Sequence, residues 1–142
     1  MIKHIMIPYD QSEPAKRALE FAVDLAKKYG SKISIVACIV PHVPMNPDVG
    51  TSYAETLELM SKNAAGAISK LGSKIAEQKI PVKTEVLNGI SITDELLSFA
   101  DAYKVDLIVM GSRGLGGFKK LLLGSVASGV SQHSKCPVLI VK

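Results

Sequence analysis

The chain alternates short apolar runs with longer segments of helical periodicity, and this alternation constrains its fold more than any other feature. Runs rich in β-branched and aliphatic residues predict five strands, at 2–8, 32–40, 82–87, 106–110 and 137–141. Their apolar residues are nearly continuous rather than strictly alternating, which is typical of strands buried on both faces. We therefore expect a parallel sheet that is covered on both sides.

The segments between these runs carry helix signals. Ser12 is a favourable N-cap and Gly30 a favourable left-handed stop, so the first helix is predicted between them. Apolar residues at three- and four-residue spacing predict a second helix over 57–75, Ser91 can cap a third, and a short fourth spans 125–133. Right-handed crossovers then build an α/β fold, a doubly wound five-stranded parallel sheet with helices on both faces.

Size and composition agree with one globular domain over residues 1–142. The chain has 142 residues, 47% of them apolar, which is enough to bury a single core. No apolar run approaches the ~20 residues of a membrane span, and the first ten residues lack a secretory signal, so we expect a cytoplasmic protein without a membrane partner. Cys38 and Cys136 are expected to be reduced thiols. The proline-rich segment 41–53 is expected to be a loop or lid.

Charge and histidine placement argue against two classes of function. The net charge is +4, but the lysines are scattered over predicted helical faces, aromatic residues make up only 5% of the chain, and there is no tryptophan. We therefore expect no nucleic-acid partner. His4, His42 and His133 have no metal-ligand spacing with cysteine or carboxylates, so no protein-bound metal is expected.

Two loops follow predicted strands and carry residues suited to binding. Asp10 lies just beyond the first strand, after Pro8, and a glycine-rich stretch, 110–127, follows the fourth strand. In doubly wound sheets, ligands bind at the carboxyl ends of the strands where the strand order reverses. The order 3-2-1-4-5 brings both loops to one crevice, whereas 2-1-3-4-5 separates them, and the glycines favour the first.

The glycine-rich stretch contains five of the 11 glycines of the chain. Backbone amides without side chains in the way can converge on an anion, and a helix that begins near Ser125 adds its positive end. The stretch lacks the lysine of a Walker A loop, and it lacks the third glycine of the dinucleotide motif. These residues alone predict an anion-binding loop. Asp10 and Ser125 also have plain structural interpretations, as a strand end and a helix cap.

Gly111-x-x-Gly114, nine residues and then Gly124-Ser125 resembles the nucleotide signature of the universal stress protein family, in its ATP-binding branch. The opening Pro8-x-Asp10-x-Ser12 and the closing Cys136-Pro137-Val138-Leu139-Ile140-Val141 extend this resemblance along the chain.

The resemblance implies an adenine nucleotide that lies across the first and fourth strands. Asp10 and Pro8 would lie against the ribose and adenine, and Cys38 would line the base pocket, although the family often has a His-Val pair where this chain has Ala37-Cys38. The phosphates would meet the glycine-rich stretch. The implied binding residues are Pro8, Asp10, Cys38, Met110, Gly111, Ser112, Arg113, Gly114, Leu115, Gly116, Gly117, Gly124, Ser125, Val126 and Ala127.

These implications predict a protein that binds ATP, ADP or AMP, with any Mg²⁺ arriving with the nucleotide near Asp10. We expect a stress-response switch that acts through a protein partner. One alternative is an enzyme that slowly hydrolyses ATP or transfers a nucleotidyl group in the same crevice, although no committed general base is apparent near the loop. The other is a nucleotide-free dimerisation module. The resemblance also implies a homodimer formed through the strand Val138 to Val141, which would otherwise be an exposed edge.

Overall fold

The computed structural model describes residues 1–41, 52–116 and 122–142. Its sheet has five parallel strands in the order β3-β2-β1-β4-β5, so the predicted order 3-2-1-4-5 is confirmed and 2-1-3-4-5 is wrong. In chain order the strands are β1 (His4–Pro8), β2 (Lys32–Ile39), β3 (Val82–Asn88), β4 (Leu107–Gly111) and β5 (Val138–Val141). The order reverses between β1 and β4, which lie side by side.

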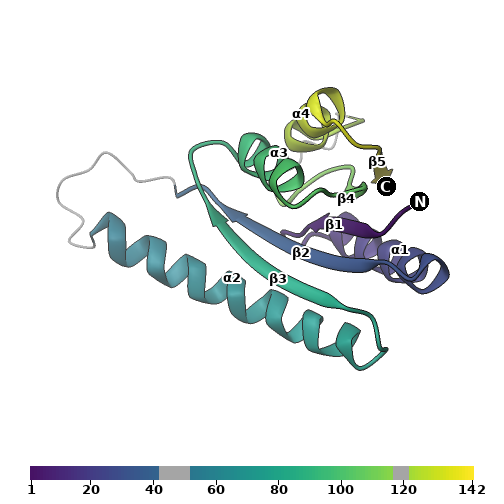
Figure 1. Cartoon of the computed structure of the whole chain (residues 1–142). Helices are drawn as coiled ribbons and strands as arrows, with labels where there is room; N and C mark the ends of the chain where they lie inside the picture. Colours follow the sequence, from purple (N-terminus) through teal and green to yellow (C-terminus); the bar gives the residue numbers. More distant parts are fainter. Residues whose placement is uncertain (42–51, 117–121) are drawn as a thin grey trace.

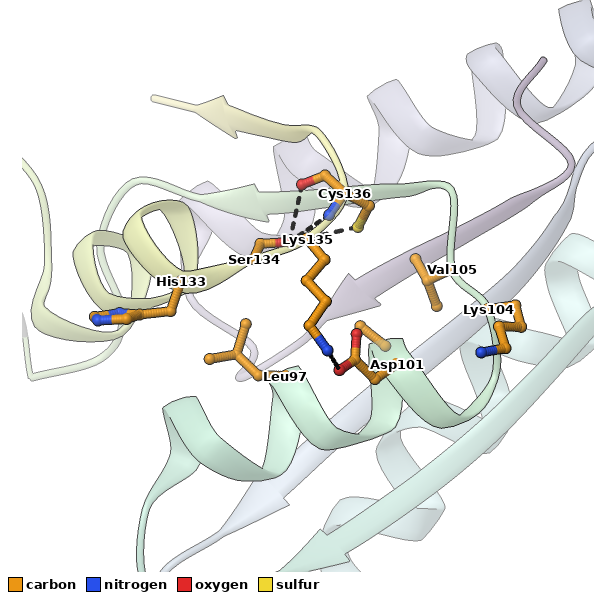
Figure 2. A pocket seen from close by; sticks show the side chains of 9 residues that line it. Leu97, Asp101, Lys104, Val105, His133, Ser134, Lys135 and Cys136 are labelled. Carbon is orange, nitrogen blue, oxygen red and sulfur yellow. Dashed lines mark hydrogen bonds and ion pairs between the residues drawn. The ribbon is translucent and has the colours of Figure 1, made fainter.

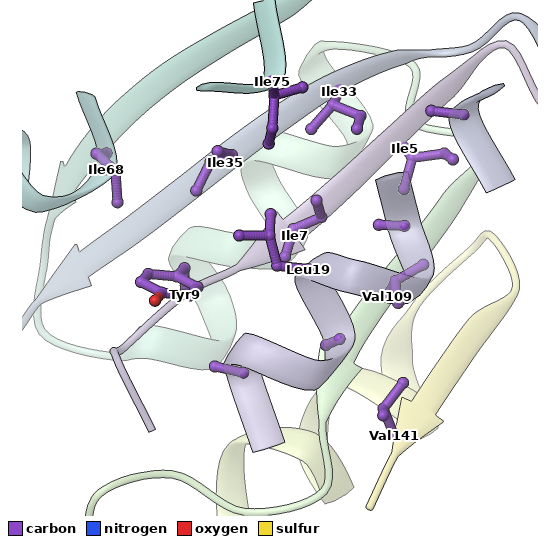
Figure 3. Close-up of a cluster of buried hydrophobic side chains, with 14 of the residues drawn as sticks. Ile5, Ile7, Tyr9, Leu19, Ile33, Ile35, Ile68, Ile75, Val109 and Val141 are labelled. Atoms are coloured by element: carbon purple, nitrogen blue, oxygen red, sulfur yellow. The ribbon is translucent and has the colours of Figure 1, made fainter. Parts of the chain in front are cut away.

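Helices cover both faces of this sheet, as the nearly continuous apolar strands predict (Figure 1). On one face, α1 (Glu13–Tyr29) and α2 (Tyr53–Ala76) pack against the odd-numbered residues of β1, such as Ile5 and Ile7. Figure 3 shows the side chains of this cluster, including Leu19 of α1 and Ile68 of α2. Removal of these apolar side chains from water is the main favourable term that holds the layers together.

The other face is covered by α3 (Ile92–Ala102) and α4 (Ser125–His133). Here the even-numbered residue Met6 of β1 packs with Val36 of β2 and Ile108 of β4, together with Leu96 of α3. Because successive side chains on a strand point to opposite faces, one run of apolar residues supplies both clusters.

The helix ends follow their capping residues. Ser12 caps α1 by accepting from the Ala15 amide, and Gly30 ends it with φ +67°, as predicted. The second helix begins four residues before the predicted 57, because Ser52 and Glu55 form a reciprocal capping box. In the part of the chain that the structure describes, no helix combines the length and the apolar character needed to cross a membrane. The predicted loop 41–53 falls largely outside the described residues.

The amino edge of the sheet holds a buried histidine. The His4 Nδ1 lies 3.1 Å from the Tyr103 carbonyl oxygen, which can only accept, so this nitrogen carries the proton. The neutral ring then accepts from the Ser34 hydroxyl at Nε2, over 2.8 Å. Burial lowers the pKa of His4 below 6.5, and the bond to Tyr103 partly opposes that shift. This edge is therefore a closed, hydrogen-bonded part of the core.

Candidate functional site

The two loops singled out in the sequence meet at the carboxyl edge of the sheet, where β1 and β4 are neighbours. The pairing of Ile5 with Leu107 and of Met6 with Ile108 brings the ends of both strands to the same edge. Asp10 follows β1, and Gly111 is the last residue of β4. The sheet order therefore brings together residues about 100 positions apart in the sequence.

Asp10 links the two loops directly. Its Oδ1 accepts from the Ser12 amide at 3.0 Å, and its Oδ2 accepts from the Leu115 amide at 3.1 Å. The first bond closes a local turn in which Gln11 has φ +68°, and the second holds the glycine-rich loop against the end of β1. Asp10 thus does more than end a strand or support a cap, because it positions the opposite loop.

Close approach explains two of the glycines. A Cβ on Gly114 would lie 2.6 Å from the Asp10 Oδ2, and a Cβ on Gly111 would lie 2.8 Å from the backbone of Pro14 at the start of α1. Among the described residues of this stretch, no glycine has a positive φ. These two residues therefore serve by lacking a side chain rather than by adopting a left-handed backbone.

Hydrogen bonds anchor the glycine-rich loop at both ends. The Ser112 amide donates to the Val141 carbonyl of β5, and the Ser112 carbonyl accepts from the Gly124 amide, each over 2.7 Å. The Ser12 hydroxyl, besides capping α1, lies 3.4 Å from the Arg113 carbonyl. Ser112 is 2% exposed, so it supports the loop from within the protein. The amides of Ser112, Leu115 and Gly124 are thus already bonded inside the protein.

The start of α4 is different, because its N-cap residue has no side chain. Gly124 occupies the N-cap position, and Ser125 is the first helical residue, so the interpretation of Ser125 as the N-cap is wrong. The first amide that bonds back along the helix is that of Ser128, which donates to the Gly124 carbonyl at 2.9 Å. The three preceding amides have no partner within the helix, and the positive end of the helix dipole lies there.

The remaining predicted residues divide into exposed and buried sets. Gly114, Leu115, Gly116 and Ser125 are exposed, and a Cβ on Gly116 would meet nothing within 4 Å. Met110 and Ala127 have buried side chains in the second core cluster, so only their backbones face the crevice edge. Pro8, Arg113 and Val126 are half-buried, and Gly117 lies outside the described residues.

Cys38 lies near the carboxyl end of β2, the strand next to β1. It is a half-buried free thiol whose pKa is raised to about 11, mainly by burial and further by the charge of Glu95. Such a thiol is neutral at physiological pH and is a poor nucleophile. The Cys38 thiol therefore adds no charge of its own at this edge of β2.

Two hollows in the described part of the chain lie away from these loops. One, shown in Figure 2, is lined by the end of α3 and by the segment from His133 to Cys136, where Lys135 is paired with Asp101. The other lies at the amino edge, between Ala26 and Pro81. Neither contains a predicted site residue, and part of the glycine-rich stretch, 117–121, is outside the described residues.

Sequence reasoning missed two features of this region. It identified Ser12 as a cap, but the contact of the Ser12 hydroxyl with Arg113 joins residues 101 positions apart and follows only from the tertiary fold. It also passed over Glu95, whose charge acts on Cys38. The signal for Glu95 was its place in the first turn of a helix that begins at the same edge of the sheet as the two loops.

Comparison with known proteins agrees with this architecture. A sequence model described as the universal stress protein family matches residues 1–142. Universal stress protein MJ0531 of Methanocaldococcus jannaschii is 34% identical, over 100% of this chain and 83% of that protein. Universal stress protein YxiE of Bacillus subtilis is also 34% identical, over 100% of both chains.

Solved structures of similar fold extend over nearly the whole chain. Universal stress protein UspA from Lactobacillus plantarum superimposes with a TM-score of 0.88 at 24% identity, covering 99% of this chain and 98% of that one. The hypothetical protein MJ0577 superimposes with a TM-score of 0.86 at 27% identity, covering 100% of this chain and 96% of that one. With the family match over residues 1–142 and these relatives, the chain belongs to the universal stress protein family.

Proposed function

We propose that this chain is a single-domain, cytosolic binding protein for an adenine nucleotide, held across the carboxyl ends of β1 and β4. The observation that carries the proposal is the start of α4, where Gly124 provides no capping side chain and three first-turn amides have no helical or side-chain partner among the described residues. Such amides, with the positive end of the helix dipole, bind phosphate groups well. The amides of Ser125, Val126 and Ala127 are the donors that we assign to the phosphates.

The glycine-rich loop supports this assignment through the space it leaves open. Apart from its chain neighbours, no described atom lies within 4 Å of the position that a Cβ on Gly116 would take, so a bound group could approach the backbone there. Arg113 is half-buried and next to this loop, and its guanidinium would offset phosphate charge. Gly111, Ser112, Gly114, Leu115 and Gly117 complete the loop, with Ser112 and Leu115 acting as its anchors.

Asp10 is suited to hold the ribose. Each carboxylate oxygen already accepts one backbone amide, and a carboxylate offers about four acceptor sites in all. The remaining sites can accept ribose hydroxyls, or lie near a Mg²⁺ ion that arrives with the nucleotide. Pro8 and Cys38 would line the base at the ends of β1 and β2, and Met110 of β4 would contribute its backbone.

Nucleotide complexes of related folds agree with this proposal. One solved universal stress protein is in complex with cAMP, with a TM-score of 0.66 at 23% identity. Another, from Archaeoglobus fulgidus, is in complex with dAMP, with a TM-score of 0.68 at 22% identity. At these identities the likeness concerns the fold, and it indicates that this fold accommodates adenine nucleotides. The choice among ATP, ADP and AMP in this chain is part of the proposal.

We further propose that nucleotide binding acts as a switch that is read by a protein partner, rather than as a step in catalysis. Near the two loops, the described ionisable groups include Asp10 and Arg113, together with Tyr9, Glu13 and Lys16. Glu13 is ion-paired with Lys16, and each Asp10 oxygen already accepts one backbone amide, so none of the carboxylates is left free to act as a general base. Slow ATP hydrolysis or nucleotidyl transfer is the alternative. Single-turnover kinetics with labelled ATP separates the two, because a binding protein returns the nucleotide intact.

The edge strand β5 supports a proposed homodimer. It forms one end of the sheet, its four residues are Val138-Leu139-Ile140-Val141, and Leu139 is 37% exposed. An uncharged edge of this kind is covered when it pairs with a second copy. We expect Leu139→Lys to shift the protein from dimer to monomer in light scattering. A wild-type monomer would contradict the proposed dimer.

Isothermal titration with ATP and Mg²⁺ tests the nucleotide proposal. We expect the wild type to bind, and Gly114→Val to abolish binding because the new side chain would collide with the Asp10 carboxylate. Gly66→Ala in α2 is the control, since its Cβ has open space and Gly66 is not one of the implied binding residues. Absence of binding by the wild type at millimolar nucleotide, or unaltered binding by Gly114→Val, would overturn the proposal and leave the nucleotide-free dimerisation module.

A further inference from the structure

A second carboxylate lies at the carboxyl edge, beyond the two loops described above. Glu95 is half-buried in the first turn of α3, which begins where the chain leaves β3 (Figure 1). Its carboxylate packs directly on Gly89, so closely that a Cβ on that glycine would collide with it. The Gly89 amide donates to the Ile39 carbonyl of β2 over 3.3 Å. The Glu95 carboxylate therefore lies at the end of the β2–β3 pair.

The Glu95 carboxylate is also near Cys38. The Cys38 partner in β3 is Leu87, two residues before Gly89, and the charge of Glu95 contributes to the raised pKa of the Cys38 thiol. Within the described residues, the Glu95 carboxylate accepts no hydrogen bond and forms no ion pair. Among the described residues no fully buried side-chain N or O atom lacks a partner, so the half-buried Glu95 carboxylate keeps part of its contact with solvent and its acceptor sites are open. The site is prepared to accept a hydrogen bond from a ligand.

We propose that Glu95 determines which base the nucleotide site accepts, by receiving a hydrogen bond from the exocyclic amino group of adenine. This inference rests on the proposed function, which directs the base from β1 toward Cys38. Adjacent strands lie about 4.8 Å apart, so a base over the end of β2 lies within one strand spacing of the β2–β3 end.

The chemistry of the carboxylate gives the direction of selection. An ionised carboxylate only accepts hydrogen bonds, and adenine presents an amino donor at its six position. Hypoxanthine and guanine present a carbonyl oxygen there, so in the orientation that points the adenine amino group at Glu95, they would place an acceptor against an acceptor. A hydrogen bond to a charged group, or its loss in a buried site, is worth on the order of ten- to a hundredfold in affinity.

The test compares ATP with ITP, in which a carbonyl oxygen replaces the amino group, by isothermal titration. We expect the wild type to prefer ATP by about tenfold or more. Glu95→Gln is nearly isosteric, and its amide both donates and accepts, so the preference should fall to within a few-fold. Asp94→Asn is the matched control, because Asp94 is an exposed carboxylate in the same helical turn, and it should keep the wild-type preference.

The outcomes separate this inference from the proposed function. If the wild type binds ATP but does not discriminate against ITP, or if Glu95→Gln keeps the full preference, the role of Glu95 is overturned while nucleotide binding stands. If the wild type binds neither nucleotide, both proposals fail. If Asp94→Asn lowers the preference as much as Glu95→Gln does, the effect belongs to the general charge of the α3 start and the specific role of Glu95 is overturned.

Discussion

Two helices begin at the same edge of the sheet, and their first turns are built in opposite ways. In α1 the Ser12 hydroxyl accepts from the Ala15 amide, Pro14 has no amide hydrogen, and the Ser12 amide goes to Asp10. In α4 the N-cap is Gly124, and within the part of the chain that the structure describes, three consecutive amides have no helical or side-chain partner. One helix start is closed by its own residues, and the other is left open to an external acceptor. A single N-cap residue decides which.

The largest effect is expected where the closed helix start meets β4. A Cβ on Gly111 would lie 2.8 Å from the backbone of Pro14, which cannot move as a flexible side chain could. Gly111→Val should therefore push α1 from the sheet and lower the free energy of unfolding by about 1–3 kcal/mol or more. Urea denaturation measures this change. Gly116→Ala should leave the urea midpoint nearly unaltered, and equal effects of the two changes would refute the packing argument.

Removing the cap of the closed start is expected to have the next largest effect. Ser12→Ala deletes the acceptor for the Ala15 amide and the contact with the Arg113 carbonyl. Loss of a serine N-cap costs about 1 kcal/mol, within a range of roughly 0.5–2. Thermal and urea unfolding should both show the loss. A Ser12→Ala protein as stable as the wild type would mean that α1 is not closed by this hydroxyl.

A capping side chain at the start of α4 should lower the affinity for ATP while it changes the free energy of unfolding very little. Gly124→Ser gives α4 a side-chain acceptor for its own amides, at the cost of a 3.3 Å approach of the new Cβ to the Arg113 Cα. We expect a change in unfolding free energy of only a few tenths of a kcal/mol, because serine and glycine N-caps differ little. The affinity for ATP should fall several-fold, because the new hydroxyl competes for the amides. Unchanged affinity in isothermal titration would place the phosphates elsewhere.

The smallest expected effect concerns the stability contribution of His4, which lies at the amino edge of the sheet, opposite the carboxyl edge where we place the nucleotide. The pKa of folded His4 lies below 6.5, so the unfolded chain takes up the proton first as the pH falls. The contribution of His4 to stability is therefore complete above pH 6.5 and is lost as the pH falls from there through the folded pKa. Urea midpoints at pH 7.5 and 5.5 measure this loss.

His4→Gln is the control for the pH effect. It should flatten this part of the stability profile and leave the ATP affinity at pH 7.5 unchanged, since His4 lies at the amino edge with Tyr103 and Ser34. A profile as steep as that of the wild type would assign the pH dependence to other groups. A loss of ATP affinity would show that the two edges are coupled.

Local signals in the sequence were enough for most of the fold. Ser12 and Gly30 mark both ends of α1 because a capping hydroxyl and a left-handed residue act within a few positions. The strand order followed from asking where the Asp10 and glycine-rich loops could meet. The start of α2 was missed although Ser52 and Glu55 carry the capping-box pattern, since the adjoining proline-rich segment suggested a longer loop.

The site was less predictable, because its geometry depends on contacts between distant residues. The bond from the Leu115 amide to Asp10 joins positions 105 apart, and no local propensity encodes it. Ser125 was a reasonable N-cap by residue type, but the structure places Gly124 at the N-cap. A Cβ on Gly124 would lie 3.3 Å from the Arg113 Cα, so packing against Arg113 restricts this position. Local rules thus located the region, and tertiary packing decided which atoms are left open.

The bonding of Ser112 has a mechanical consequence. The Ser112 amide donates to the Val141 carbonyl of β5, and the Ser112 carbonyl accepts from the amide of Gly124, the N-cap of α4. Because both bonds are made by Ser112, this one residue connects β5 at the end of the sheet with the start of α4. Any sliding of β5 must be taken up by this residue or passed on to the helix start, so a load applied at the outer strand is transmitted over a single residue.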